Sequence, residues 1–144
     1  MGAKRAEQVV DIAAPPQAVF EAIMDFDTYP EWQTAVKRTE VRERDEAGRP
    51  AVVETVADAK VKEVRYVLRY HYDEPTRVWW DFIEGDVRDV GGEWLLEELD
   101  GDRTRAHYRL EIDPGRFLPG PLRRILEGQV MRTVVEEVRE RVEG

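Results

Sequence analysis

Six strand-length segments follow one another between residues 36 and 113, and only short turns separate them. The turns are rich in glycine, proline and acidic residues, as in Asp45-Glu46-Ala47-Gly48, Asp73-Glu74-Pro75-Thr76 and Asp100-Gly101-Asp102. Parallel strands need a crossover of roughly a dozen residues or more, whereas antiparallel neighbours join through short turns like these. We therefore predict an antiparallel meander. Its strands are expected at residues 36–44, 51–58, 62–72, 77–84, 87–98 and 103–112.

Apolar and charged side chains alternate along these strands, which predicts one dry and one wet face. The apolar positions that share a face are Tyr66, Leu68, Tyr70, Tyr72, Val78, Trp80, Phe82, Trp94, Leu96, Ala106, Tyr108 and Leu110. The opposite face carries charged residues and both histidines, His71 and His107, which we expect to be exposed. The dry face must be covered by another layer of structure.

A strand at residues 4–12 precedes the meander, and a helix is expected to follow that strand. Pro16 suits the first turn of a helix. The apolar stripe of this helix is Val19, Phe20, Ile23 and Phe26. We expect it to stop before Tyr29-Pro30, because the residue before a proline disfavours the α conformation. One further short turn is expected at residues 31–33.

The C-terminal stretch, residues 119–143, predicts a long helix that covers the dry face. About 24 helical residues at ~1.5 Å each give a rod of roughly 36 Å, which crosses a small domain. Its apolar stripe is Met131, Val134, Val135, Val138 and Val142. Toward the N-terminal end the stripe passes through Gly128, Glu127 and Arg124, so packing is expected to give way there to a cavity wall.

Composition indicates one soluble globular domain, residues 1–144. The 22 basic and 31 acidic residues give a formal charge of −9, which argues against nucleic acid as a partner. Cysteine and serine are absent from the sequence, which excludes thiol and serine nucleophiles. With two histidines we expect neither a metal site nor another cofactor.

Membrane and export signals are also missing from the sequence. No apolar run approaches the ~20 residues that a membrane span needs. The N-terminal residues lack the apolar core of a signal peptide. We therefore expect a cytoplasmic protein without integral membrane association, either a monomer or a homodimer.

Three segments carry a resemblance to a known superfamily. They are Ile12-Ala13-Ala14-Pro15-Pro16-Gln17-Ala18-Val19-Phe20, Asp25-Phe26-Asp27-Thr28-Tyr29-Pro30-Glu31-Trp32 and Leu118-Pro119-Gly120-Pro121-Leu122-Arg123-Arg124. With the order of elements, they resemble the START-like (SRPBCC, Bet v 1-like) superfamily, and most closely its bacterial polyketide cyclase/dehydrase-like and coenzyme Q-binding members. The resemblance implies an α+β helix-grip fold. In that fold a curved antiparallel sheet of six or seven strands wraps around a long C-terminal helix, two short helices follow the first strand, and a cavity lies between sheet and helix.

The aromatic face has two interpretations. Its side chains can fill a core, or they can line a ligand cavity whose polar groups include tyrosine hydroxyls. The resemblance favours the cavity, since members of the superfamily bind sterols, lipids, quinones or polyketide-like rings. The candidate ligand-binding residues are Trp32, Tyr66, Leu68, Tyr70, Trp80, Phe82, Trp94, Tyr108, Arg124, Glu127, Met131 and Val135.

Two charged candidates keep alternative interpretations. Glu127 could act as an acid or base with a raised pKa, and Arg124 could hold an acidic group of a ligand. Alternatively they form an i, i+3 ion pair worth about a few tenths of a kcal/mol.

Residues 116–124 could form a lid that touches a membrane or a partner, or a loop packed on the sheet. Thr55 is expected to face inward and Glu54 outward, although a one-residue slip would make Glu54 a cavity carboxylate.

Three functions remain open from the sequence. The first is the binding, transport or sequestration of a small hydrophobic ligand, such as a lipid, a quinone or a polyketide-like ring compound. The second is a cyclase or dehydratase that uses the same cavity, with Glu127 as a weak catalytic candidate. The third is a protein-interaction module like the co-chaperone or ribosome-associated members of the superfamily.

Overall fold

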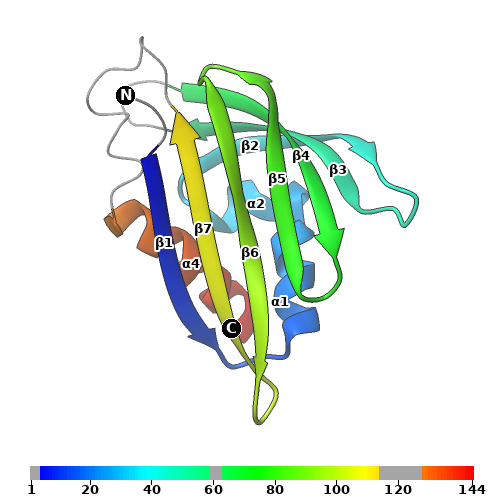
Figure 1. Ribbon diagram of the computed structural model, residues 1–144, viewed down its shortest axis with the longest axis vertical. Helices are drawn as coiled ribbons and strands as arrows, with labels where there is room; N and C mark the ends of the chain where they lie inside the picture. Colours follow the sequence, from blue (N-terminus) through cyan, green and yellow to red (C-terminus); the bar gives the residue numbers. More distant parts are fainter. Residues whose placement is uncertain (1–3, 59–62, 114–127) are drawn as a thin grey trace.

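The computed structural model describes residues 4–58, 63–113 and 128–144. Seven antiparallel strands form one sheet in the order β1-β7-β6-β5-β4-β3-β2 (Figure 1). The strands are β1 (Lys4–Ile12), β2 (Val36–Arg44), β3 (Pro50–Asp58), β4 (Glu63–Asp73), β5 (Arg77–Gly85), β6 (Asp89–Leu99) and β7 (Arg103–Asp113). The predicted meander is confirmed, and β1 adds to it by pairing with β7.

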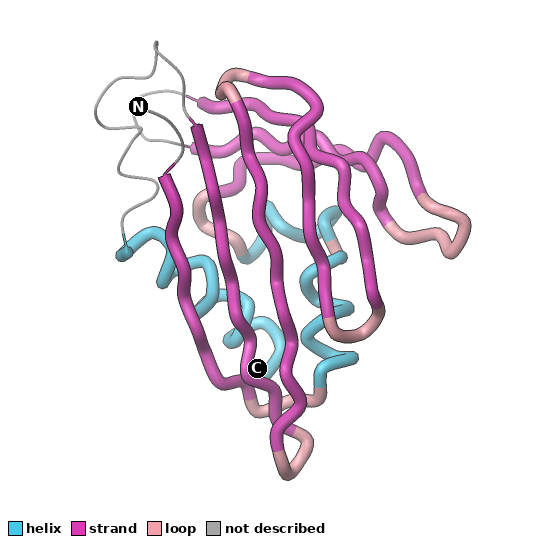
Figure 2. The backbone as a smooth tube through the Cα atoms, in the orientation of Figure 1, coloured by secondary structure: helices cyan, strands magenta, loops and turns pink. Residues whose placement is uncertain are grey.

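The helices lie together on one face of the curved sheet (Figures 1 and 2). They are α1 (Pro16–Met24), the 3-10 turn η1 (Phe26–Thr28), α2 (Tyr29–Trp32) and α4 (Gly128–Glu143). The short helix α2 begins two residues earlier than expected, because Pro30 fits within its first turn. The part of the predicted long helix before Gly128 lies outside the described residues. No helix in the described ranges is both long and apolar enough to span a membrane.

The core lies between the concave face of the sheet and the helices. The strand residues expected on the dry face include several that are almost fully buried, namely Val78, Trp80, Trp94, Leu96 and Ala106. From the helices, Phe20, Ile23, Met131, Val135 and Val138 are each no more than 1% exposed. Burial of an aliphatic or aromatic side chain stabilises the fold by about 1.5–3 kcal/mol, so this layer supplies most of the stability.

The outer face is charged, as expected, but it is not uniformly wet. Val52, Val56 and Val67 are at most 4% exposed there. They neighbour Glu54 and Arg65 in the strand register, and these two side chains are paired with each other. The stems of such arginines cover apolar surface while their guanidinium groups stay in water. Charged residues therefore shield a small second cluster on this side of β3 and β4.

Hydrogen bonds fasten α4 to two chain junctions. Near its end, Glu143 accepts a 2.8 Å hydrogen bond from the backbone N–H of Ala13, between β1 and α1. About two turns earlier, Glu137 accepts hydrogen bonds from the backbone N–H and the hydroxyl of Thr34, which lies between α2 and β2. These bonds set the position of the helix along the sheet.

The junction between β1 and α1 is held from the sheet as well. Thr104 of β7 is fully buried, pairs with Ile12, and donates a 2.7 Å hydrogen bond from its hydroxyl to the carbonyl of Ala14. Pro15 and Pro16 then set the extended-to-helical turn that starts α1. Since the buried hydroxyl of Thr104 has no access to water, its bond to this carbonyl fixes where α1 begins.

Replacement of Thr104 by valine keeps the side-chain shape and removes this hydroxyl. We expect Thr104→Val to lower the free energy of unfolding by about 1–3 kcal/mol, the cost of leaving a buried polar group unsatisfied. Thr76→Val is the matched control, because the hydroxyl of Thr76 makes an exposed hydrogen bond with Asp73. Urea unfolding of both variants measures the difference; equal losses would contradict the role given to Thr104.

Candidate functional site

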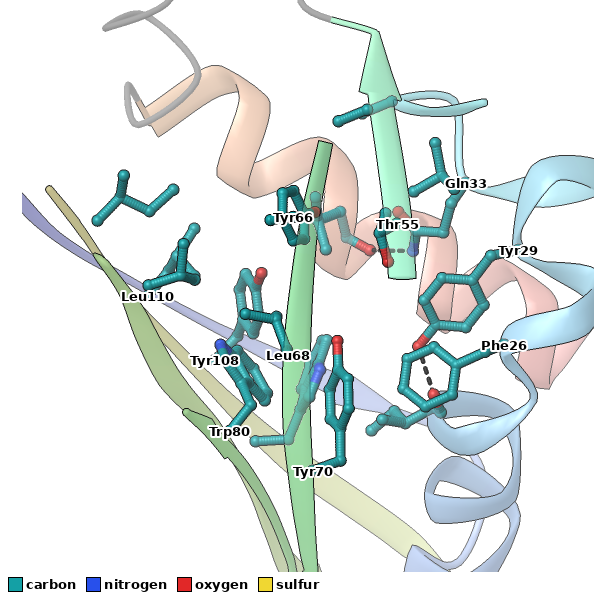
Figure 3. Close-up of a pocket in the computed structure, with 18 of the residues that line it drawn as sticks. Phe26, Tyr29, Gln33, Thr55, Tyr66, Leu68, Tyr70, Trp80, Tyr108 and Leu110 are labelled. Carbon is teal, nitrogen blue, oxygen red and sulfur yellow. Dashed lines mark hydrogen bonds between the residues drawn. The ribbon is translucent and has the colours of Figure 1, made fainter. Parts of the chain in front are cut away.

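A cavity of about 170 Å³ lies between the sheet and the helices, inside the layer that forms the core (Figure 3). The described residues that line it come from the three helices, η1, the strands and the segments that join them. They are Ile23, Phe26, Tyr29, Gln33, Ala35, Val36, Thr55, Ala57, Val64, Tyr66, Leu68, Tyr70, Trp80, Val87, Val90, Trp94, Tyr108, Leu110, Ile112, Met131, Val134 and Val138. None of these residues carries a charge.

Aromatic rings form a continuous wall along one side of the cavity. Phe26 lies 4.6 Å from Tyr70 between ring centroids, and Tyr70 lies 5.7 Å from Trp80. Tyr108 continues the series at 6.1 Å from Trp80 and contacts Trp94 at 4.5 Å. Tilted rings at these spacings attract one another by about 0.5–1.5 kcal/mol per pair, which stabilises the arrangement of the wall.

Three tyrosine hydroxyl groups among the lining residues are free within the described structure. Tyr66, Tyr70 and Tyr108 make no hydrogen bond to any described residue, whereas Tyr29 donates one to the carbonyl of Ile23. Burial raises the pKa of Tyr66 to about 12. Burial and the neighbouring phenols raise the pKa of Tyr70 well above its usual range. All these phenols therefore stay protonated near neutral pH and can act as donors or acceptors, but not as bases.

Two further polar side chains, Gln33 and Thr55, lie on the other side of the cavity. Gln33 is 4% exposed, and its amide nitrogen donates a 3.3 Å hydrogen bond to the carbonyl of Val134 on α4. Thr55 of β3 is 5% exposed, and its hydroxyl has no partner among the described residues. Figure 3 shows Gln33 and Thr55 on one side of Leu68, and Trp80 and Tyr108 on the other. The cavity thus has polar groups on both sides of Leu68.

A single glycine makes room for the indole of Trp80. Gly92 of β6 pairs with Trp80 of β5, and a β-carbon at position 92 would lie 2.7 Å from Cζ2 of that indole. It would also lie 2.3 Å from the backbone oxygen of Arg109. At the preceding position, Gly91, the nearest atom to such a carbon would be 3.9 Å away. Gly92 is therefore required by close approach, and Gly91 is not.

Seven residues expected at a ligand line the cavity, and three do not. Those that line it are Tyr66, Leu68, Tyr70, Trp80, Trp94, Tyr108 and Met131. Trp32, Phe82 and Val135 are not among its described lining residues. Arg124 and Glu127 lie outside the described residues, as does the segment 116–124, so the expectations for them remain predictions.

Each of these three side chains lies in a different local setting. The indole of Trp32 donates a 2.9 Å hydrogen bond to the hydroxyl of Thr28 and packs under Arg141, away from the cavity. Phe82 lies where β5 pairs with β4 and no longer with β6, and it packs half-buried against the core. On α4 the lining residues are Met131, Val134 and Val138, and Val135 is buried beside that stripe.

Most of the other lining residues were not predicted as site residues, and four of them are aromatic or polar. Phe26, Tyr29 and Gln33 come from the corner between α1 and β2, and Thr55 comes from β3. The aromatic residues around Tyr29-Pro30 were a usable signal, but they were assigned to a chain break. Thr55 does face inward, as the strand register predicted.

The charged candidates on the sheet lie on the outer face. Glu54 bonds Arg65 and Arg42, and the hydrogen bond from Arg65 holds its pKa below the usual range. His71 and His107 are half-buried there and pair with acidic neighbours, Asp81 at 2.7 Å in the case of His71. None of these groups reaches the cavity.

Comparison with known proteins gives one family match. A family described as polyketide cyclase / dehydrase and lipid transport matches residues 12–139. No curated protein matches the sequence significantly.

Several solved structures share the fold. A START superfamily protein from Mycobacterium smegmatis is 20% identical, with a TM-score of 0.84, over 96% of this chain and 97% of that one. The Zhui aromatase/cyclase from Streptomyces sp. R1128 is 22% identical, with a TM-score of 0.80, over 98% and 94%. The protein TTHA0849 from Thermus thermophilus is 24% identical, with a TM-score of 0.81, over 96% and 97%.

The two adjacent glycines of β6 allow a matched test of the cavity wall. We expect Gly92→Ala to lower the free energy of unfolding by about 1–3 kcal/mol, because its β-carbon overlaps backbone and indole. Gly91→Ala should change it by less than about 0.5 kcal/mol. Urea unfolding, followed by tryptophan fluorescence, measures both. Equal stability of the two variants would show that the close approach at Gly92 is not needed.

The buried phenols predict a loss of stability in alkali. The folded protein keeps the proton of Tyr66 up to about pH 12, whereas a free tyrosine releases it near 10.0. The free energy of unfolding therefore falls as pH rises from 10 toward 12, by up to about 1.4 kcal/mol per pH unit for one such group. Tyr66→Phe should remove this contribution.

The measurement compares urea unfolding of the native protein and Tyr66→Phe at pH 8 and pH 11.5. The variant should lose about 1–2 kcal/mol less than the native protein between the two values. Any effect of the substitution that does not depend on pH cancels in this comparison. An identical pH dependence would mean that the hydroxyl of Tyr66 is not sequestered.

Proposed function

Because the chain belongs to the polyketide cyclase/dehydrase and lipid transport family, we propose that it binds a small, neutral, largely apolar ligand in the cavity between the sheet and α4. Lipids, quinones and polyketide-like ring compounds are the classes considered. The observation that carries the proposal is the combination of an apolar wall, three free phenol groups and no charged side chain among the described lining residues. Ligand sites commonly combine an apolar lining with a few polar groups that fix orientation.

The size of the cavity narrows the choice of ligand. A cavity of about 150 Å³ holds one benzene molecule in another protein, and the cavity here measures about 170 Å³. A single ring, or a short part of a larger molecule, fits the observed arrangement. A compound of several rings requires the wall to move. The hydroxyl groups of Tyr66, Tyr70 and Tyr108 make no described hydrogen bond, so these side chains can move without breaking one.

Neutrality of the wall supports a ligand without charge. A charged ligand would lose its hydration and find no described counter-charge, which costs several kcal/mol or more. A neutral ring loses little and gains about 25 cal/mol for each Å² of apolar surface removed from water. Binding in the cytoplasm, followed by transport or sequestration, is the simplest use of such a site and is part of the proposal.

A cyclase or dehydratase is the second candidate, and the free phenols favour it in one respect. Protonated tyrosines can donate hydrogen bonds to a carbonyl group of a substrate and so polarise it. Proton removal would need a base, and the described lining residues include none. Glu127, the candidate acid or base from the sequence, lies outside the described part of the chain, so its role stays a prediction.

A pair of compounds with the same rings tests the proposal. We expect 1-naphthol, which is neutral, to bind saturably, and 1-naphthalenesulfonate to bind about tenfold more weakly or not at all, because the described wall has no cation. Isothermal titration calorimetry measures both. Equal affinity for the two compounds would contradict a neutral site, and a lack of saturable binding across neutral ring compounds would contradict the cavity as a ligand site.

Two valines of α4 supply the matched variants for the same experiment. Val134 lines the cavity, whereas Val142 packs on the core without lining it. Val134→Phe should fill the cavity and weaken naphthol binding by about tenfold or more, and Val142→Phe should leave the affinity unchanged. Far-UV circular dichroism checks that both variants fold.

A further inference from the structure

The indole N–H of Trp80 is buried without a hydrogen-bond partner. Among the described residues, its Nε1 is the one side-chain nitrogen or oxygen with less than 1 Å² of open surface that lacks a hydrogen-bond partner. By contrast, the indole of Trp32 donates to Thr28. An unsatisfied buried polar group costs about 1–3 kcal/mol, so its presence calls for a compensating role.

The unpartnered N–H belongs to a side chain of the cavity wall. Trp80 is 6% exposed and lines the cavity, with Tyr70 and Tyr108 as its neighbouring rings in the wall. A β-carbon at Gly92 would lie 3.0 Å from Cε2 of the indole, the carbon bonded to Nε1. The absence of a side chain at Gly92 thus leaves room for the indole in this position.

The chemistry of the indole limits the partner that it can take. Indole N–H is a donor and cannot accept a hydrogen bond, so its partner must be an acceptor. Since the described wall carries no charge, the acceptor that fits best is neutral. A ketone or quinone carbonyl on a ring meets both conditions, because its oxygen accepts hydrogen bonds while the rest of the ring is apolar.

We propose that the Trp80 N–H anchors a carbonyl oxygen of the ligand, which makes the site selective for ring ketones and quinones over the corresponding hydrocarbons. This inference rests on the proposed function, because it needs a ligand in the cavity. Less than 1 Å² of Nε1 is open, so water in the cavity does not satisfy it. The proposal therefore requires the indole or a neighbouring ring to shift when the ligand binds. The rings of Tyr70 and Tyr108 lie 5.7 Å and 6.1 Å from that of Trp80, and their hydroxyls make no described hydrogen bond that such a shift would break.

The anchor also orients the ligand. Figure 3 places Trp80 and Tyr108 on one side of Leu68 and Gln33 and Thr55 on the other. A carbonyl bound by Trp80 therefore lies at the Trp80 end, where the free hydroxyl of Tyr108 is available as a second donor. Any hydroxyl or amine group of the ligand is directed toward Gln33 and Thr55.

The indole signals of the native protein test the anchor directly. The chain has four tryptophans, and nitrogen-15 labelling gives one indole signal for each. The Trp80 signal is assigned by elimination with phenylalanine variants of Trp32, Trp79 and Trp94. We expect 1-tetralone to move the Trp80 indole proton downfield, as a new hydrogen bond does, and tetralin, which lacks the carbonyl, to bind without that shift.

Affinities of the same two compounds give an independent readout. Trp80→Phe removes the N–H and should reduce the preference for tetralone over tetralin about fivefold, the effect of one net hydrogen bond. Trp79→Phe, whose ring stacks on His71 and is not part of the described lining, should leave the preference unchanged. If Trp80→Phe does not fold, the signals of the native protein decide.

The outcomes separate the two proposals. If both compounds bind, the Trp80 signal stays in place and the preference survives in Trp80→Phe, then the anchor is wrong while the ligand site stands. If neither compound binds saturably, the ligand site and the anchor fail together. A downfield shift with tetralone alone, and a lost preference in Trp80→Phe alone, support the anchor.

Discussion

The packing of α4 on the dry face of the sheet is the contact on which the rest of the structure depends. Met131, Val135 and Val138 of α4 are each 1% exposed, and no other described helix is long enough to cover β1 and the cavity together. Side-chain carboxylates at Glu137 and Glu143 hold the helix to two junctions of the chain. The apolar face supplies the energy, and these polar bonds determine where along the sheet the helix lies.

The cavity arises from a mismatch between two surfaces. The curved sheet presents large rings, among them Trp80, Trp94 and Tyr108, which meet at tilted angles and leave space beside them. On the helix side α4 contributes Met131 and two short valines, Val134 and Val138, to the lining. A well-packed core would place small residues against large ones more evenly. The unfilled volume therefore follows from the choice of residues on both sides.

Much of this arrangement was predictable from the sequence. What was not predictable is which residues of the inner face of the sheet reach the cavity. Alternation along a strand determines which side a residue lies on, so Tyr66, Trp80 and Tyr108 were placed correctly. It does not tell which residues of that face reach the cavity, and Phe82 is on the inner face without being among the described lining residues. Gln33 was missed because its position depends on contacts across the fold, which no local pattern records.

The lack of charge in the described wall has a consequence for kinetics. The protein has a formal charge of −9, and such a charge speeds or slows the approach of ionic molecules in a salt-dependent way. A neutral ligand feels no such force on its way to a neutral cavity. Its association rate should therefore be the same at low and high ionic strength. Under the proposed function, differences in affinity between neutral ligands should therefore come mainly from their dissociation rates.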